Sequence, residues 1–590
     1  MYDYVIVGAG SAGCVLAARL SEDPEVRVCL LEAGPSDDSF FVRMPFGIAA
    51  MMRSRQRNWR FRTEPEPNCA GRRMFWPRGR MLGGSSALNA MCYTRGHHTD
   101  YDHWASLGNT GWSYAEVLPY FKRFENRERG ADGFHGTGGP YNVAELRDPN
   151  ELSLAFVEAA VETGLPRNDD FNGARQEGAG LYEVMQKDGQ RCCNARAFLR
   201  TPGSDGMAPV ERPNLTIFTG ARVTRVLFEG TRAVGVTCRH RSRDTEVPAS
   251  HEVLLCGGTV NSPQLLLLSG IGPADELARH GIAQVLELPG VGKNLQDHPD
   301  VLVVHKATRR VGYSFGPLFI WRAAKGLMDY LARRRGPFTS NLAEAGGFAR
   351  TSAALDLPDV QYHFLPAIQE NHGLTLRRSL GFGFSLHVCV LRPRSRGEIG
   401  LKSADPLADP RIQPNYLADP ADLRTLVAGV RTARRILAAR AFDPYRGREL
   451  SPGESINSDA AIADFVRQRC ETLYHPVGTC KMGVDAMAVV DPELRVRGLH
   501  GLRVVDASIM PTLIGGNTNT PTTMIADKAA DRIRQARRGT PVHTRLPQAS
   551  SQPPAATEAQ AMSRDQAGRP DRHLRTSNAT NSWGISPAPS

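Results

Sequence analysis

Long apolar runs are missing from this chain of 590 residues. No stretch of about 18 uncharged apolar residues occurs, which is close to the length that a membrane-spanning helix needs, so the sequence predicts no transmembrane segment. An apolar strand starts at residue 2 or 3 and leaves no room for a signal peptide before it. These two absences favour a cytoplasmic protein.

Patterns for metals, disulfides and nucleic acids are missing as well. The 11 cysteines include no C-x-x-C pair, and Cys192 and Cys193 are adjacent, which suits neither a zinc site nor an ordinary disulfide. We therefore expect no metal, and mostly buried thiols in a reducing compartment. Basic residues form no cluster with interleaved aromatic ones, so nucleic acid is not an expected partner. The net charge of +11 fits an anionic partner such as a membrane surface, or simple solubility.

The N-terminus contains a complete dinucleotide-binding pattern. A short apolar run at residues 5–7 leads into G-x-G-x-x-G at Gly8, Gly10 and Gly13, and an apolar helix follows. In this pattern the first glycine permits a tight turn, the second leaves room for a pyrophosphate and the third lets the helix pack close to the strand. The helix N-terminus offers N–H groups to the phosphates. A second strand ends on Glu32, whose carboxylate can accept hydrogen bonds from ribose hydroxyls.

Two further glycine-rich segments follow in the chain. Residues 79–96 place Gly83, Gly84 and two serines before an apolar stretch, and residues 257–272 place two glycines after a buried strand. Backbone of this kind can approach a phosphate or a flat ring closely. Taken alone, each segment indicates only a tight turn.

Together these segments resemble the signatures of the glucose–methanol–choline (GMC) family of flavin oxidoreductases. The similarity runs in order from residue 2 to about residue 535 and includes two C-terminal motifs. Within the family the chain most resembles bacterial alcohol dehydrogenases that act on aliphatic primary alcohols, with choline dehydrogenases close behind. The resemblance implies an α/β fold, with a Rossmann-type FAD-binding domain and an α+β substrate domain built on an antiparallel sheet with helices.

The resemblance also implies domain limits. The FAD-binding domain is expected to cover residues 1–298, with excursions, and to resume over residues 471–538 with the catalytic residues. The substrate domain is expected mainly at 299–470, with sheet strands at 360–365, 384–391 and 397–401. Residues 539–590 are rich in Pro, Ser, Ala and Gln and lack apolar periodicity, so we expect a disordered tail.

The C-terminal motifs carry the predicted chemistry. His475 begins H-P-V-G-T, which matches the family's catalytic histidine motif, and it would take the hydroxyl proton of an alcohol or hold the forming alkoxide. Asn519 is expected to hydrogen-bond the same oxygen while a hydride passes from carbon to flavin N5 and leaves an aldehyde. Pro521 suits the first position of a helix over 522–537, whose N-terminal dipole would stabilise the negative charge of the reduced flavin.

The remaining cofactor contacts follow from the resemblance, which places the backbone of Val223 against the adenine. Leu88 stands where some choline oxidases carry the histidine that attaches FAD covalently, so FAD should be bound non-covalently. The predicted cofactor residues are Gly8, Gly10, Ser11, Ala12, Gly13, Glu32, Ala33, Gly83, Ser85, Asn89, Ala90, Met91, Val223, Asp506, Ala507, Asn517, Pro521 and Thr522.

Three readings of the reaction stay open. The main one is a dehydrogenase that oxidises an aliphatic alcohol and passes electrons to a quinone or another acceptor that is not oxygen; the others are a choline dehydrogenase and an oxidase that uses oxygen. Glu344 could attract a cationic substrate, but a structural acid is the preferred interpretation. A non-catalytic relative would not need both His475 and Asn519, and a nicotinamide dehydrogenase would not need the later flavin signatures.

The segment 315–335 has two interpretations. Leucines, a Trp and a Tyr alternate there with Lys325 and several arginines, as in a basic amphipathic helix that lies on an anionic bilayer at the inner membrane face. The preferred alternative is a helix packed on its own domain with a solvated basic face. Nothing in the sequence sets the oligomeric state.

Overall fold

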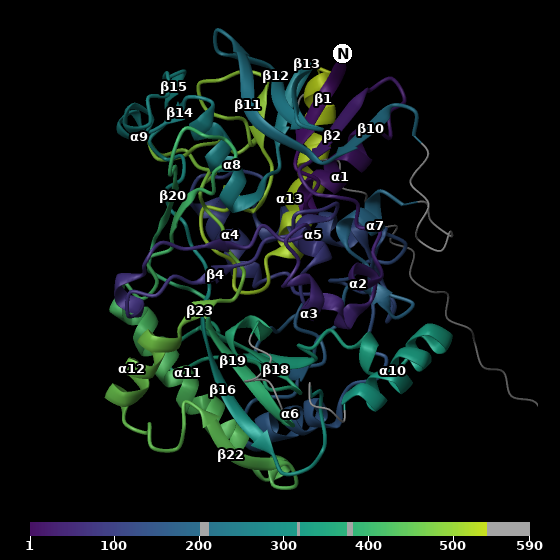
Figure 1. The fold of residues 1–590 in the computed structure, drawn as a ribbon, viewed down its shortest axis with the longest axis vertical. Helices are drawn as coiled ribbons and strands as arrows, with labels where there is room; N and C mark the ends of the chain where they lie inside the picture. Colours follow the sequence, from purple (N-terminus) through teal and green to yellow (C-terminus); the bar gives the residue numbers. More distant parts are fainter. Residues whose placement is uncertain (201–211, 315–318, 375–380, 540–590) are drawn as a thin grey trace, which may run out of the picture. The chain divides into compact units, whose positions relative to one another are not determined.

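The computed structural model describes residues 1–200, 212–314, 319–374 and 381–539, without the side chains of 319–322 (Figure 1). The predicted disordered tail, except Gly539, and the first four residues of the segment 315–335 lie outside the described residues. Within the described ranges, each helix is too short or too polar to cross a bilayer.

A parallel sheet forms the N-terminal dinucleotide-binding unit. Its parallel strands follow the order β10 (Leu215–Thr219), β2 (Val28–Glu32), β1 (Tyr2–Val7), β13 (Arg243–Leu255) and β24 (Leu502–Val504). β13 continues an antiparallel meander with β11 (Ala221–Glu229) and β12 (Arg232–His240). Every residue of β2 is buried, as expected for a parallel strand that is covered on both faces. Helix α1 (Ser11–Leu20) packs against α13 (Asn519–Arg537) beside this sheet.

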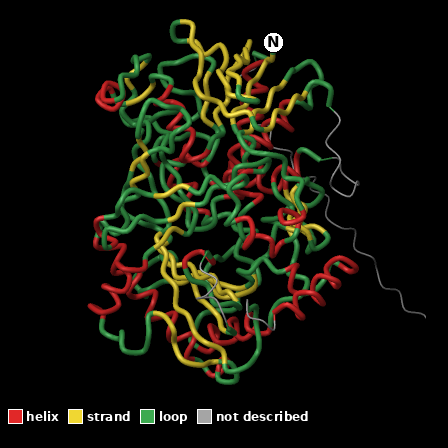
Figure 2. Tube along the Cα trace, viewed as in Figure 1, coloured by secondary structure: helices red, strands yellow, loops and turns green. Residues whose placement is uncertain are grey.

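A second sheet is wholly antiparallel, and Figure 2 shows it as a separate group of strands. Its strands follow the order β22 (Arg446–Ser451), β16 (Pro299–Ala307), β19 (Gly383–Val390), β18 (Val360–Leu365), β17 (Ala345–Ala349) and β7 (Gly178–Leu181). β23 (Glu471–Thr472) adds a short pairing to β16. Helices α6 (Glu151–Glu162) and α11 (Pro420–Ala438) pack on its strands.

Three sequence-based limits differ from the structure. The second sheet takes β7 from within 1–298 and β23 from beyond 470, so the two predicted domains exchange segments. The predicted strand at 397–401 is β20 (Glu398–Gly400), which pairs with β21 (Arg411–Gln413) outside the second sheet. The N–H of Leu401, at the end of this segment, donates to Glu276 of the helix Ala274–Arg279 at 2.7 Å and not to a strand of the second sheet.

The C-terminal helix also starts earlier than predicted. α13 begins at Asn519 with Thr518 as its N-cap, so Pro521 is its third residue instead of its first. Proline is tolerated there because the first N–H groups of a helix have no partner within the helix.

The other elements connect and flank the two sheets. They are α2 (Phe40–Arg43), α3 (Ile48–Met51), α4 (His98–Ser106), α5 (Tyr114–Phe124), α7 (Asn194–Phe198), α8 (Gly258–Leu268), α9 (Ala274–Arg279), α10 (Phe319–Arg333), α12 (Asp459–Arg469), the 3-10 turns η1 (Pro45–Gly47), η2 (Pro67–Cys69), η3 (Gly84–Ala87), η4 (Pro337–Thr339), η5 (Asn371–Gly373), η7 (Arg440–Phe442) and η8 (Ala507–Ile509), and the short strands β3 (Phe61–Arg62), β4 (Phe75–Trp76), β5 (Glu125–Arg127), β6 (Tyr141–Val143), β8 (Gln186–Lys187), β9 (Gln190–Arg191), β14 (Ile271–Gly272) and β15 (Leu286–Glu287).

Candidate functional site

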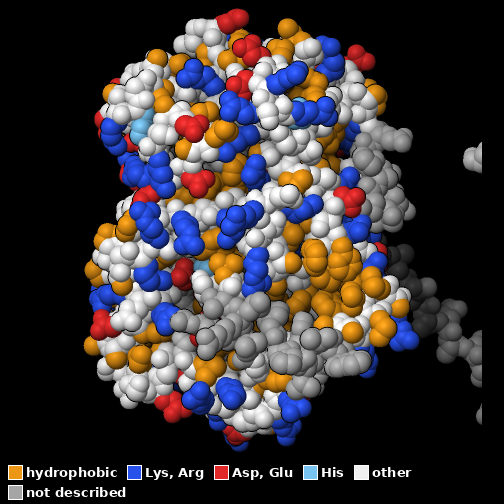
Figure 3. Space-filling view, viewed as in Figure 1, with side chains coloured by type: hydrophobic (Ala, Val, Ile, Leu, Met, Phe, Trp, Pro, Cys, Tyr) orange, Lys and Arg blue, Asp and Glu red, His pale blue; other side chains and the backbone are white. Residues whose placement is uncertain are grey.

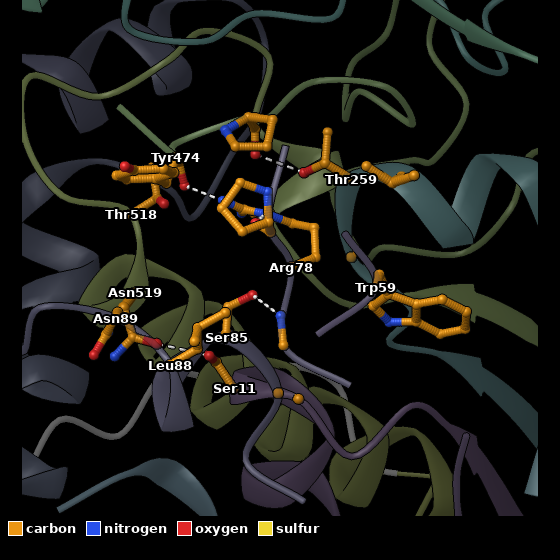
Figure 4. Close-up of a pocket in the computed structure, with 18 of the residues that line it drawn as sticks. Ser11, Trp59, Arg78, Ser85, Leu88, Asn89, Thr259, Tyr474, Thr518 and Asn519 are labelled. Carbon is orange, nitrogen blue, oxygen red and sulfur yellow. Dashed lines mark hydrogen bonds between the residues drawn. The ribbon is translucent and has the colours of Figure 1, made fainter. Parts of the chain in front are cut away.

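A cavity of about 370 Å³ is lined by residues of both sheets (Figure 4). At one end it meets the glycine turn after β1, and elsewhere it meets His363 of β18 and His387 of β19. Most of the predicted site residues line it, namely Gly8, Gly10, Ser11, Ala12, Glu32, Ala33, Ser85, Asn89, Ala90, Met91, Val223, His475, Asp506, Ala507, Asn517, Asn519 and Thr522.

Three predicted cofactor residues do not line the cavity. Gly13 lies behind it, where a Cβ atom would fall 1.9 Å from the carbonyl oxygen of Gly8. Gly83 has φ of +84° and packs beside Cys193, and Pro521 is buried inside the first turn of α13. These residues shape the walls of the cavity without lining it, and their direct contact with the cofactor stays a prediction.

The two glycine turns form a cradle with no room for side chains. A Cβ atom on Gly84 would lie 2.6 Å from the Cα atom of Gly10, and one on Gly8 would lie 2.6 Å from the carbonyl oxygen of Cys256. Gly10 caps α1 without a side-chain hydrogen bond, so the first N–H groups of that helix need another acceptor. A pyrophosphate is a suitable acceptor at a helix N-terminus, so this end of the cavity fits a dinucleotide.

Glu32 and Asp506 are the two carboxylates that line the cavity among the described residues. Glu32 accepts the N–H groups of Ala9 at 3.0 Å and Gly34 at 2.8 Å, and burial raises its pKa to about 7. Asp506 accepts from Gly258 N–H at 2.8 Å and from the Ser262 hydroxyl at 2.6 Å. Both acids thus belong to the cradle region, where they hold backbone and would face the polar parts of a dinucleotide.

His475 is fixed by a chain of hydrogen bonds to one tautomer. Nε2 of His298 lies 3.1 Å from the carbonyl oxygen of Leu391, which can only accept, so this nitrogen carries the proton. Burial lowers the pKa of His298 to about 4, so the ring is neutral and its Nδ1 is an acceptor. Nδ1 of His475 lies 2.9 Å from it and must donate. The Nε2 atom of His475 is therefore an unprotonated acceptor.

The lone pair on His475 Nε2 faces an amide donor. The Nδ2 atom of Asn517 lies 3.2 Å from it. The Oδ1 atom of Asn517 accepts from Thr94 Oγ1 at 3.0 Å and from Gln361 Nε2 at 3.1 Å, which turns the NH₂ group toward His475. Burial, with His298 nearby, lowers the pKa of His475 well below its ordinary value, so the ring stays a neutral base. A base and a neutral donor thus meet at one point of the cavity wall.

Asn519 does not take part in this pair, so its predicted role beside His475 is wrong. Its Oδ1 accepts from the Ser11 hydroxyl at 2.6 Å, and its Nδ2 donates to the Tyr141 hydroxyl at 2.7 Å. Figure 4 shows Asn519 beside Ser11, while Thr518 lies beside Tyr474. Because α13 begins at Asn519, residue 517 lies outside the helix and its side chain points to another part of the cavity.

The residue before the histidine is strained. Tyr474 has φ of +71°, a left-handed conformation that non-glycine residues rarely adopt. Nη2 of Arg78 donates to its carbonyl oxygen at 2.7 Å, and His475 N–H donates to Asp297 at 2.8 Å. These contacts hold the backbone on both sides of the ring and so fix the direction in which the imidazole points.

Sequence reasoning missed the supporting residues His298, Gln361 and Thr94. His298 lies 177 residues before His475, and Gln361 lies 156 residues before Asn517, so no local pattern links them. The Q-D-H motif at 296–298 was visible in the sequence, but nothing in its spacing indicated that its histidine would orient another one.

Glu344 lies away from the cavity lining. Its carboxylate is fully buried and accepts four hydrogen bonds, from Asn150 N–H at 2.7 Å and the hydroxyls of Ser153 at 2.7 Å, Tyr313 at 2.7 Å and Ser340 at 2.5 Å. Four donors satisfy a carboxylate, so this acid is structural, as the sequence analysis preferred. The cavity lining also includes the apolar side chains of Met91, Leu342, Leu365, Ala367, Ile368 and Leu473.

Family models for the two parts of the GMC oxidoreductases match this chain over residues 2–300 and 393–526. The alcohol dehydrogenase [acceptor] of Pseudomonas putida is 50% identical over 536 residues, which cover 90% of this chain and 96% of that protein. The oxygen-dependent choline dehydrogenase of Paraburkholderia xenovorans is 47% identical over 541 residues, which cover 90% of this chain and 94% of that one.

Solved structures with the same fold include two oxidases. The pyridoxine 4-oxidase of Mesorbium loti has a TM-score of 0.79 and 34% identity, and the match covers 91% of this chain and 99% of that one. A formate oxidase variant from Aspergillus oryzae, solved to study modification of its FAD, has a TM-score of 0.83 and 27% identity over the same shares.

Proposed function

Because the chain belongs to the GMC oxidoreductase family, we propose that it uses FAD to oxidise an uncharged primary alcohol to an aldehyde. One observation carries this proposal. The unprotonated Nε2 of His475 and the NH₂ group of Asn517 lie 3.2 Å apart in the wall of a cavity that also contains a dinucleotide cradle. An alcohol oxygen that contacts both this base and this donor is ready to lose its proton.

The cradle residues would hold the cofactor. Gly8, Gly10 and Ser11 would face the pyrophosphate, Glu32 the ribose and Val223 the adenine, and the turn from Asn89 to Met91 would lie against the flavin. When bound, FAD supplies a hydride acceptor at flavin N5.

We expect FAD to be released when the protein is denatured. Leu88 has no nucleophilic atom, so it cannot form the covalent bond that a histidine would form at this position. Acid precipitation of the yellow holoenzyme should leave colourless protein and flavin in the supernatant. Colour that stays with the precipitate would show a covalent link elsewhere.

The side chains of this site manage the proton and the oxygen of the substrate. Nε2 of His475 accepts the hydroxyl proton, and Nδ2 of Asn517 donates to the same oxygen as negative charge develops on it. His298 keeps Nδ1 of His475 protonated, so that Nε2 remains the basic atom through each cycle. The apolar walls exclude water and direct the carbon that carries the hydrogen.

The substrate is an uncharged alcohol and not choline. Within the described residues, the carboxylates that line the cavity, Glu32 and Asp506, belong to the cradle, and Glu344 is fully hydrogen-bonded elsewhere. Asp297 accepts from His475 N–H but does not line the cavity, so a quaternary ammonium group would meet no further carboxylate in the described lining to balance its charge. The sequence identity of 50% with an alcohol dehydrogenase of Pseudomonas putida supports this choice, while the sequence similarity to choline dehydrogenases keeps choline as the second candidate.

We expect turnover with medium-chain primary alcohols and an artificial electron acceptor, and at least about tenfold lower kcat/KM with choline, since tenfold corresponds to only about 1.4 kcal/mol. A dye-coupled assay measures both, and oxygen consumption without dye separates a dehydrogenase from an oxidase. Preference for choline would move the protein to the second candidate. Rapid oxygen uptake would contradict an acceptor other than oxygen.

The physiological acceptor in this proposal is a quinone or another compound that is not oxygen. The similar protein of Pseudomonas putida is an alcohol dehydrogenase [acceptor], which supports a separate acceptor. Quinones dissolve in membranes, so peripheral membrane contact forms part of the same proposal.

A further inference from the structure

An apolar patch lies on the surface where Figure 1 labels α2 and α10. Its members are Phe41 of α2 and Met328 and Leu331 of α10, whose exposed fractions are 49%, 64% and 55%. The rings of Phe40 and Tyr330 pack edge to face with centroids 6.1 Å apart, so the two helices share one surface. Figure 3 shows hydrophobic side chains gathered over this part of the molecule. We call these three residues the α2–α10 patch.

The outward face of α10 is apolar along its middle. Ala324, Met328, Leu331 and Ala332 are exposed and follow the spacing of one helix face. The same helix packs on its own domain at Gly326 and also exposes Lys325 and Arg333, so both interpretations of 315–335 stay predictions.

Positive charge flanks the patch. Lys325 and Arg333 are exposed on α10, and Arg335 follows the helix. Asp329 is the acid in this stretch, and Arg335 lies 3.2 Å from Asp148 of a neighbouring loop, so basic groups remain in excess. Apolar side chains flanked by basic ones match a bilayer with anionic headgroups. The apolar side chains can enter the boundary of the acyl chains, and the basic side chains are attracted to the headgroups.

Beneath α10, a layer of aromatic side chains leads from the inward face of this helix to the cavity wall. A Cβ atom on Gly326 of α10 would lie 2.8 Å from Pro337 and 3.3 Å from Phe338, so α10 sits directly on η4. Phe338 packs edge to face on Phe46 with ring centroids 5.6 Å apart. Phe46 belongs to the apolar cluster that includes Leu342 and Ala367, and both of these line the cavity.

We propose that the α2–α10 patch lies on an anionic lipid bilayer, and that long-chain alcohol dissolved in the bilayer reaches the cavity through the layer of Phe46 and Phe338. The inference rests on the proposed oxidation of an apolar alcohol, because such a substrate partitions into membranes. This proposal gives each feature a role. The apolar side of α10 enters the bilayer, its basic flanks bind the headgroups, and the apolar cavity wall receives the alcohol.

Vesicle co-sedimentation of the full-length holoenzyme tests the docking. Wild type should bind vesicles of phosphatidylglycerol and phosphatidylcholine, and bind less to phosphatidylcholine alone. The double variant Met328→Ser/Leu331→Ser should bind at least about tenfold more weakly, because it removes two inserted side chains. The matched control Leu154→Ser/Val161→Ser changes two apolar residues of α6 with exposed fractions of 47% and 37%, and should bind like wild type.

Turnover separates docking from chemistry. All three proteins should oxidise a short, water-soluble alcohol at equal rates. With hexadecanol presented in anionic vesicles, the oxidation rate of the patch variant should be at least about fivefold lower than that of wild type, in line with its weaker vesicle binding.

Equal vesicle binding by the patch and control variants, or none by wild type, would overturn the docking. A dimer that the patch variant converts to a monomer would assign the patch to a second copy. Vesicle binding without oxidation of any alcohol would retain the docking and refute the proposed function.

Discussion

Replacing His475 by alanine lowers the turnover of a primary alcohol by at least about a hundredfold, the smaller end of what general base catalysis contributes. The alcohol then has no acceptor for its hydroxyl proton, since Asn517 can donate but cannot accept at its Nδ2 atom. FAD should stay bound, because the cradle of Gly8, Gly10 and Glu32 does not include the imidazole. Steady-state rates and the flavin absorbance of the purified variant give both results.

The exposed His103 on α4 provides a control, and His103→Ala should leave the turnover of the alcohol unchanged. Turnover of His475→Ala within about tenfold of wild type would refute the role of His475 as base, because so small a loss lies below what a general base contributes.

Replacing Asn517 by alanine lowers kcat by about a hundredfold, while replacing Asn519 leaves kcat within a few-fold of wild type. Asn517 donates toward His475 at 3.2 Å and would stabilise charge on the alcohol oxygen. Asn519 is occupied by Ser11 and Tyr141, so its loss should weaken retention of FAD instead. The two residues are separated by one position, which makes each a matched control for the other.

Kinetics with saturating FAD and an ultrafiltration assay for bound flavin separate these two effects. A large loss of kcat in Asn519→Ala together with near-normal kcat in Asn517→Ala would reverse the assignment. It would restore the residue that the sequence pattern favoured.

The sequence predicted the cradle because its parts are local. Strand, glycine turn, helix and acid follow one another within 32 residues, and each glycine has a steric reason that the structure displays directly, such as the 2.6 Å between a Cβ on Gly8 and Cys256. The catalytic histidine, His475, could be predicted in the same way, since its motif matches that of the family residue by residue. Both predictions depended on short stretches of chain.

The second member of the pair was misassigned because its direction depends on where a helix begins. Pro521 suggested a helix that starts at residue 521, whereas α13 starts at Asn519 and takes the proline into its first turn. That earlier start takes Asn519 into the helix, while Asn517 stays outside it and faces His475. The sequence N-T-N contains both candidates and gives no signal for choosing between them.

Long-range pairing explains the other differences. β7 joins the second sheet through β17, more than 160 residues later, and β20 leaves that sheet to pair with β21. Alternating apolar residues predict that a strand exists, but its partner depends on packing between distant segments. The support of His475 by His298 is of the same kind.

Anaerobic addition of alcohol to the purified holoenzyme tests the central claim most directly. With 1-octanol the visible flavin bands should bleach within a single turnover, and with choline they should persist, because the carboxylates among the described residues that line the cavity, Glu32 and Asp506, belong to the cradle. Bleaching by choline and not by 1-octanol would contradict the account of the substrate. Persistence of the bands with both would contradict alcohol oxidation by this site.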